Sequence, residues 1–237
     1  MSDSKITIRT AILVDGGFYK KRARYYWGEK TPEKRAEELR KYCMSLLYSK
    51  YENRSLYRIF YYDCPPLSKK IYHPMLKRTI DLKRTPEYAW QNTFLEELHS
   101  KRKFAIRLGE LSENTAQYIL KPESVKKLIN GTITVDMLRE NDFSFQAEQK
   151  GVDMRIGVDI ISMALKQQVQ QIILISGDSD FVPAAKQARR EGIDMILAPM
   201  GATIKQNLHE HIDGLINRVN DPDAHEFDAP ESDSEDA

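Results

Sequence analysis

A short apolar run that ends in two carboxylates limits the folds open to this chain more than any other feature. Residues 172–175 are Ile, Ile, Leu and Ile, and Asp178 and Asp180 follow after Ser176 and Gly177. Such a run, bounded by turn residues, is typical of a strand buried on both faces of a parallel sheet. A second run at 11–14 has the same character and ends at Asp15. Two buried strands that end in acids predict a site at one edge of an α/β sheet, because ligands bind at the carboxyl ends of parallel strands.

Helical and strand patterns alternate along the chain, which indicates βαβ units and a parallel sheet covered on both faces. The clearest helix start is Thr31 as N-cap with Pro32 at the first helical position. We expect strands over 10–15, 55–63, 104–111, 171–176 and 193–199, and helices over 31–51, 85–103, 152–167, 180–192 and 201–211.

The length of 237 residues suits one large domain with insertions. We predict a domain over residues 1–218 with insertions at about 64–84 and 112–150, followed by a disordered acidic tail over 219–237. The chain has no apolar run long enough to cross a bilayer, no signal-like N-terminus, and two cysteines without metal-binding spacing. These features favour a reducing, cytoplasmic location.

The net charge of +1 hides a strong asymmetry. Eight of the 35 acidic residues follow Arg218 and no Lys or Arg does, which leaves residues 1–220 with 36 basic and 27 acidic residues, a net charge of +9. A basic body is typical of a protein with an anionic partner, most often nucleic acid, although solvated surface charge is the plain alternative.

Four acids are expected to meet at the predicted edge. If the strands that precede Asp15 and Asp178 are neighbours, these two acids converge there with Asp180, two residues on. Asp153 lies in the first turn of the helix over 152–167, and we expect its carboxylate to point toward the sheet. Four carboxylates at one place would repel unless a cation screened them. Mg²⁺ or Mn²⁺ prefers such oxygen ligands, and an ion held there can activate water against a phosphodiester.

Three motifs carry a family resemblance: "ILVDGG" at 12–17, "KGVDMRIGVDI" at 150–160 and "ILISGDSDFVPAAKQARREGIDMIL" at 173–197. Together they resemble the NYN domain, a family of PIN-like nucleases that includes the LabA-like bacterial proteins. The resemblance implies an α/β PIN-like three-layer fold with strand order 3-2-1-4-5 and a metal-dependent ribonuclease. It implies that the catalytic acids are Asp15, Asp153, Asp178 and Asp180, of which the first three are metal ligands.

The resemblance also gives secondary candidates: Asp159 in the same helix, Lys150 of the Lys-Gly-Val-Asp motif, and Ser176, which we expect to bond an acid or the loop backbone. The sequence departs from the family where many members have an Asn two residues after the first Asp, because Gly17 stands there. Each acid also has a plain alternative, as a helix cap or a turn residue. Asp63 ends a strand as well, and we interpret it as a turn acid before Pro65.

A basic and aromatic stretch follows Asp15 and is the predicted nucleic-acid contact. Its candidate residues are Phe18, Tyr19, Lys20, Lys21, Arg22 and Arg24. The rings of Phe18, Tyr19, Tyr25, Tyr26 and Trp27 are predicted to stack on unpaired bases.

The leading hypothesis is therefore an Mg²⁺- or Mn²⁺-dependent endoribonuclease acting on single-stranded RNA, with DNA and assembly into a homo-oligomer left open. The alternative is a non-catalytic RNA-binding or regulatory assembly module that retains the PIN-like fold. A phosphatase of the haloacid dehalogenase type is disfavoured, because it needs a second acid where Gly17 stands.

Overall fold

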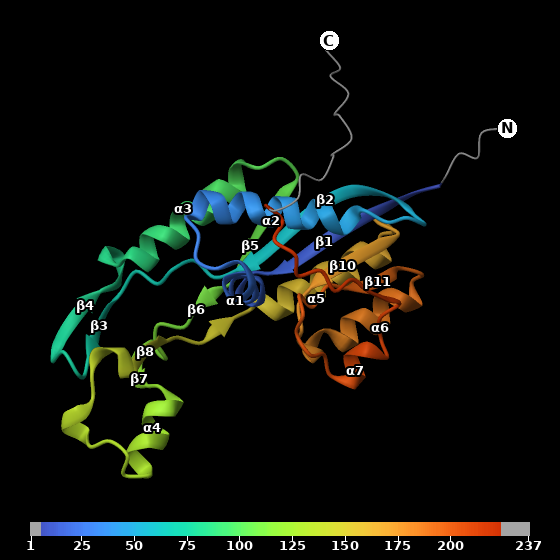
Figure 1. The fold of residues 1–237 in the computed structure, drawn as a ribbon. Coiled ribbons are helices and arrows are strands. Elements are labelled where there is room, and N and C mark those ends of the chain that lie inside the picture. Colours follow the sequence, from blue (N-terminus) through green and yellow to red (C-terminus); the bar gives the residue numbers. More distant parts are fainter. Residues whose placement is uncertain (1–5, 224–237) are drawn as a thin grey trace.

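A six-stranded parallel sheet lies at the centre of the computed structural model, which describes residues 6–223 (Figure 1). Its strands lie in the order β12-β11-β10-β1-β2-β5. Their bounds are β1 Thr7–Asp15, β2 Asn53–Asp63, β5 Phe104–Leu108, β10 Gln171–Ile175, β11 Asp194–Leu197 and β12 Gly214–Leu215. Taken in chain order, the first five main strands have the predicted 3-2-1-4-5 arrangement. The short β12 adds an edge strand that the sequence did not predict.

Two layers of helices cover this sheet, as Figure 1 shows. One face is covered by α1 (Gly16–Trp27), α2 (Pro32–Leu47) and α3 (Pro86–Ser100), and the other by α5 (Val152–Leu165), α6 (Val182–Arg190) and α7 (Gln206–His209). The alternation within β1 explains both cores, since Ile12 and Val14 face the first layer while Ala11 and Leu13 face the second. The predicted α/β class with a doubly covered parallel sheet is confirmed.

Helix α1 is the main element that the sequence analysis missed. No helix was expected between residues 15 and 31, yet one begins directly at Gly16. The Asp15 side chain accepts a hydrogen bond from the backbone N–H of Phe18 at 3.0 Å and so caps the helix. A satisfied N-cap offsets the low helix propensity of glycine.

The end of the chain also differs from expectation. The helix predicted over 201–211 is only the single turn of α7, and the chain then pairs with β11 through β12. The short 3₁₀ helix η4 (Ser179–Phe181) precedes α6.

The two predicted insertions form one arm, which comprises residues 64–84 and 110–150. The His73 ring lies 4.4 Å from that of Tyr118 and 5.4 Å from that of Phe143, which joins the two segments. The arm extends from the carboxyl ends of β2 and β5, and its tip around α4 lies far from the sheet (Figure 1). Its elements are β3 Lys70–His73, β4 Arg78–Asp81, η1 Leu82–Arg84, β6 Glu110–Leu111, β7 Gln117–Leu120, α4 Pro122–Ile129, η2 Val135–Met137, η3 Glu140–Asp142, β8 Phe143–Gln146 and β9 Gln149–Lys150.

The start of the predicted tail is held against α1 and α2. The Trp27 indole N–H donates to the carbonyl oxygen of Val219 at 2.9 Å, and the ammonium of Lys30 lies 2.7 Å from a carboxylate oxygen of Asp223. Residues 219–223, the start of the tail predicted to be disordered, are therefore fixed by contacts with α1 and α2. The rest of that tail, 224–237, lies outside the described residues.

Cys43 and Cys64 are both free and buried. In residues 6–223, the helices are all too short or too polar to cross a bilayer.

Gly16 allows β1 to bring Asp15 close to β2, so we predict that Gly16→Ala is destabilising. An added Cβ would lie 2.5 Å from the Tyr61 ring and 2.6 Å from the backbone oxygen of Tyr62. We expect a loss of about 1–3 kcal/mol in the free energy of unfolding, measured by urea denaturation.

Gly17→Ala is the matched control, because its Cβ would meet nothing closer than Asp15 Oδ1 at 3.6 Å. This control should retain wild-type stability or exceed it. Equal losses in the two variants would show that the close approach at Gly16 is not what limits stability.

Candidate metal centre

Asp15 is the central residue of the predicted site. Its neighbour Val14 pairs with Ile175 on one side, and Asp15 itself pairs with Tyr62 on the other, so the carboxylate lies between β10 and β2. The half-buried side chain accepts the Phe18 N–H through Oδ1 and the Ser176 hydroxyl, at 3.3 Å, through Oδ2. Each oxygen keeps a free lone pair, so a capping role leaves Asp15 able to bind a cation.

Ser176 links the carboxylate of Asp15 to the backbone of the loop that follows β10. It is fully buried, donates to Asp15, and accepts the backbone N–H of Asp178 at 3.2 Å. The expected contacts to an acid and to the loop backbone are therefore both present. This hydroxyl fixes the start of the loop that carries Asp178 relative to the end of β1.

Asp178 and Asp180 occupy the turn that leads into α6. Both are exposed, and Asp178 Oδ1 accepts the Asp180 N–H at 3.0 Å, which makes Asp178 the N-cap of η4. The capping alternative thus holds for Asp178, but it uses only one of the two carboxylate oxygens.

Asp153 approaches the same place from α5. Gly151 precedes the helix with a φ of +77°, a value that favours glycine, and lets the chain turn from β9 into α5. Ile156 and Ile160 are buried on the inner face of the helix, whereas Asp153 is exposed. The expectation that this side chain is turned away from solvent is wrong, since Asp153 is exposed, but its charge still acts on Asp15 at the end of β1.

Electrostatic coupling joins these acids into one cluster. The pKa of Asp15 is raised, first by burial and then by the charges of Asp153 and Asp63. The pKa of Asp153 is raised by partial burial and by the charges of Asp178 and Asp180. Like charges close enough to disturb one another's protonation create a demand for a cation. We name Asp15, Asp153, Asp178 and Asp180 the aspartate cluster.

Asp63 is a neighbour of this cluster that the sequence analysis took for a turn acid. It ends β2 as Asp15 ends β1, is only 2% exposed, and raises the pKa of Asp15. Tyr61 Oη, Gln91 Nε2 and the Cys64 N–H donate to it at 2.8, 2.9 and 2.8 Å, and Lys20 Nζ lies 2.6 Å away. The sequence carried a signal for this position, because Asp63 ends a predicted strand just as Asp15 does. Because its charge is already neutralised, Asp63 fits a supporting role better than direct metal binding.

Two secondary candidates lie apart from the aspartate cluster. Asp159 accepts a hydrogen bond from Tyr62 Oη at 2.7 Å and pairs with Arg107 at 3.2 Å. Six residues of helix separate it from Asp153, which turns it well around the α5 axis. Lys150 is exposed on β9 and pairs through its backbone with Glu110.

The aromatic residues of α1 do not form the predicted stacking surface. Tyr19 is fully buried and donates to Glu38 at 2.9 Å, and Trp27 is 8% exposed within the core. Phe18 is half-buried with its ring against Gly177. Tyr25 and Tyr26 are exposed at the far end of the helix. Burial of Tyr19 and Trp27 excludes them as RNA contacts.

The basic candidates of α1 differ in their availability. Arg22 donates to the Met200 carbonyl oxygen at 2.9 Å, Lys20 pairs with Asp63, and Arg24 pairs with Glu29. Lys21 is exposed, and it makes no ion pair within the described part of the chain. Lys21 is thus the predicted contact with the most accessible charge.

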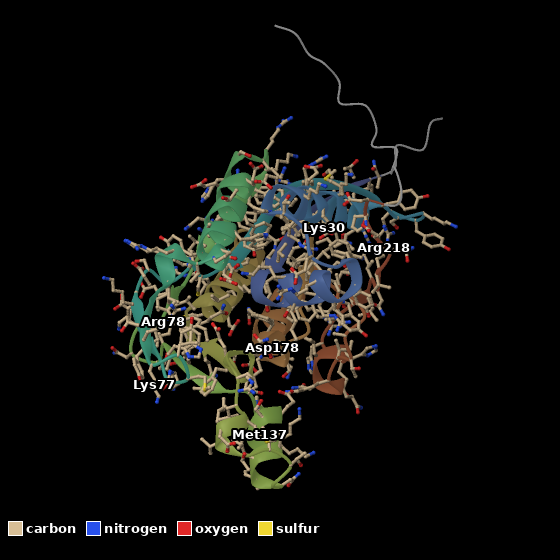
Figure 2. The ribbon with its side chains drawn as sticks, turned by 60° about the vertical axis from the view of Figure 1, so that its left-hand side comes forward. Lys30, Lys77, Arg78, Met137, Asp178 and Arg218 are labelled. Atoms are coloured by element: carbon tan, nitrogen blue, oxygen red, sulfur yellow. The ribbon has the colours of Figure 1, made fainter. Side chains whose placement is uncertain are left out.

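A second acidic group proves to be an ion-pair network. Among residues 6–223, Glu38, Asp221 and Asp223 are the one acidic trio whose oxygens all lie within 4.8 Å of one another. The Lys30 ammonium lies 2.7, 3.6 and 2.7 Å from them, so a lysine already neutralises the place a metal would take. Lys30 and Asp178 lie well apart in Figure 2.

The aspartate cluster is wider than this trio, and its four members have no lysine or arginine as an ion-pair partner in residues 6–223. Exposed Asp153 and Asp178 can rotate, or bind an ion through water. A set of carboxylate oxygens with an uncompensated negative charge fits Mg²⁺ or Mn²⁺.

The sequence model of the NYN domain family matches residues 9–217. The chain belongs to the NYN domain family. This range includes the whole aspartate cluster and the arm, and membership in a family of PIN-like nucleases supports a nuclease. A comparison with curated proteins found no match.

Since the charge of Asp15 opposes folding in the absence of metal, we predict that Asp15→Asn stabilises the metal-free protein. A raised carboxyl pKa means that the folded state holds the proton more tightly, so the penalty is fully present above the folded pKa and is lost as pH falls toward 3.8, the ordinary pKa of an aspartate. A gain of about 1 kcal/mol would raise Tm by about 2–4 °C at pH 7. Asn keeps the capping oxygen.

Thermal melts in EDTA at pH 7 and near pH 4 measure this effect, and the gain should shrink at the lower pH. Asp136→Asn is the control, because the Thr134 hydrogen bond lowers the pKa of that exposed carboxyl and its removal should bring no gain. A less stable Asp15→Asn at pH 7 would contradict the repulsion.

Proposed function

We propose that this protein is an Mg²⁺- or Mn²⁺-dependent endoribonuclease that hydrolyses phosphodiester bonds in single-stranded RNA. The observation that carries the proposal is the electrostatically coupled aspartate cluster at the carboxyl edge of the sheet. Family membership supports the reaction class. Retention of all four acids tells against a non-catalytic module.

In this proposal Asp15, Asp153 and Asp178 bind the metal, directly or through water. A bound divalent ion would supply an activated water and charge stabilisation for the leaving oxygen. Asp180, beside Asp178 in the η4 turn, orients the water or helps to bind a second ion.

The other residues of the site position these acids. The Phe18 N–H and the Ser176 hydroxyl fix both oxygens of Asp15, and the buried Ser176 sets the loop of Asp178. Lys20 and Asp63 place a half-buried ammonium beside the site, where it can contact a phosphate oxygen.

Several finer assignments belong to the same proposal. We assign the protein to the LabA-like group on its three motifs and place it in the cytoplasm on its two free thiols. Residues 1–218 form the nuclease domain. Assembly into a homo-oligomer stays a prediction.

We predict that the wild-type protein cleaves labelled single-stranded RNA with Mn²⁺ and not with EDTA, and that Asp178→Asn lowers the rate by about 100-fold or more. The substitution removes a negative oxygen from the metal site but keeps a capping oxygen for η4. Calorimetry should show weaker Mn²⁺ binding by the same variant.

Asp136→Asn on the arm is the matched control, since it removes one carboxylate far from the cluster. Unchanged cleavage by Asp178→Asn, with wild-type metal binding, would exclude the aspartate cluster as the active site.

A preference for single-stranded substrate is also predicted. The phosphodiester must reach the half-buried Asp15 at the end of β1 as well as the exposed acids around it, and a flexible strand can bend toward Asp15 more easily than a stiff duplex. The test compares one RNA sequence free and annealed to its complement, with Mn²⁺ in both reactions. We expect the free strand to be cut at least about tenfold faster, a difference of about 1.4 kcal/mol in the barrier. Equal rates would refute the preference.

A further inference from the structure

A groove of about 560 Å³ lies between α1 and the first turns of α3. Its lining includes Lys20, Lys21 and Arg24 from α1 and Pro86, Trp90 and Gln91 from α3. We infer that this groove binds a nucleotide of the RNA strand next to the scissile phosphate, with the base against Trp90 and the phosphate at Lys21. The inference rests on the proposed function for the identity of the strand.

The groove adjoins Asp63, which follows Tyr62, the β2 residue that pairs with Asp15 of the aspartate cluster. Lys20 Nζ lies 2.6 Å from Asp63 and 2.9 Å from Gln91 Oε1, and Gln91 Nε2 donates to Asp63 at 2.9 Å. Lys20 and Gln91 line the groove, while Asp63 is close enough to Asp15 to raise its pKa. A strand with one phosphate at the cluster would therefore extend its neighbouring nucleotide into the groove.

Trp90 is held as a rigid aromatic wall. Its ring stacks on that of Phe94 with centroids 5.0 Å apart and planes inclined by 18°. The indole N–H donates to the carbonyl oxygen of Lys30 at 3.0 Å. A half-buried indole fixed on one side offers a ready surface to an unpaired base, and stacking of this kind tolerates any base.

The charge of the groove suits a phosphate. Four basic residues line it against two acids, Glu29 and Glu87. Arg35 is neutralised by buried Glu38, and Arg24 forms a largely exposed ion pair with Glu29. Lys21 is exposed and has no ionic partner in residues 6–223, so its ammonium is free to meet a phosphate.

The chain provides its own reporter, because it has only two tryptophans, Trp27 and Trp90. Titration with unlabelled oligouridylate in EDTA should quench tryptophan emission, since stacked bases quench indoles. Trp90→Phe should still bind a labelled strand by fluorescence anisotropy but lose the quenching. Trp27→Phe, which replaces the buried indole with another aromatic ring, should keep the quenching.

A charge variant tests the phosphate contact without touching the core. Lys21→Gln should weaken RNA binding about fivefold at low salt and reduce the slope of log K against log salt by about 0.7. Lys186 is an exposed lysine on α6, so Lys186→Gln makes the same change in net charge. This control should leave the RNA affinity and the salt slope unchanged.

Any one of three results would refute RNA binding in this groove. The first is unchanged wild-type tryptophan emission on mixing with the oligouridylate, whether or not anisotropy shows the strand bound. The other two are undiminished quenching in Trp90→Phe and equal RNA affinities for the two lysine variants. These outcomes are separate from failure of the nuclease. Loss of Mn²⁺-dependent cleavage with quenching intact would reject the proposed reaction and keep the groove. Mn²⁺-dependent cleavage without quenching of tryptophan emission would support the proposed reaction and reject the groove as the nucleotide site.

Discussion

Repulsion among carboxylates at the carboxyl edge of the sheet is the constraint around which the rest of the structure is arranged. Asp15 is half-buried, its pKa is raised by the charges of Asp153 and Asp63, and the pKa of Asp153 is in turn raised by the charges of Asp178 and Asp180. Such a set persists only if the backbone that carries it is held firmly. The buried segment 10–14 of β1 and the fully buried β10 hold it, because their register cannot slip without turning core residues outward. Ser176 adds the local connection between the two strand ends.

The same constraint explains why α1 begins where it does. Asp15 both ends β1 and caps α1, so the positive end of that helix lies next to the carboxylate. Helix direction then places Lys20 against Asp63. One acid in the cluster region is thereby neutralised from within the chain, and the remaining acids are left for an ion.

The acids at the strand ends could be predicted from the sequence because they follow local apolar patterns, whereas the strand order 3-2-1-4-5 was implied by the resemblance to the NYN domain. Apolar runs mark buried strands, and the edge where their carboxyl ends meet follows from parallel topology. The stacking surface could not be predicted in this way. Aromatic residues between lysines on α1 suggested an RNA contact, but Tyr19, Ala23 and Trp27 recur every four residues and form the buried stripe of the helix. That spacing was the signal that could have corrected the interpretation.

Trp90 is the opposite case, a candidate RNA contact that the sequence analysis did not identify. It lies on a different helix, and only the packing of α3 against the rest of the fold brings it beside Lys20 and Lys21. Similarly, nothing local in residues 64–84 and 110–150 predicts that they join through His73, Tyr118 and Phe143 into one arm. Contacts between distant segments depend on the completed fold, so sequence periodicity carries no trace of them.

Comparison of the two acidic groups shows what distinguishes a metal site from a structural network. Glu38, Asp221 and Asp223 lie closer together than the aspartate cluster, yet Lys30 neutralises them and Lys41 adds a second cation at 3.0 Å from Asp223. Their attraction joins the end of the described chain to α2 and leaves no charge for a metal. The aspartate cluster is looser and more exposed, and within residues 6–223 its members pair with no lysine or arginine. Proximity of acids is thus a weaker sign of a metal site than uncompensated charge on a rigid frame, and by that criterion the cluster at the sheet edge is the one that requires an ion from outside the chain.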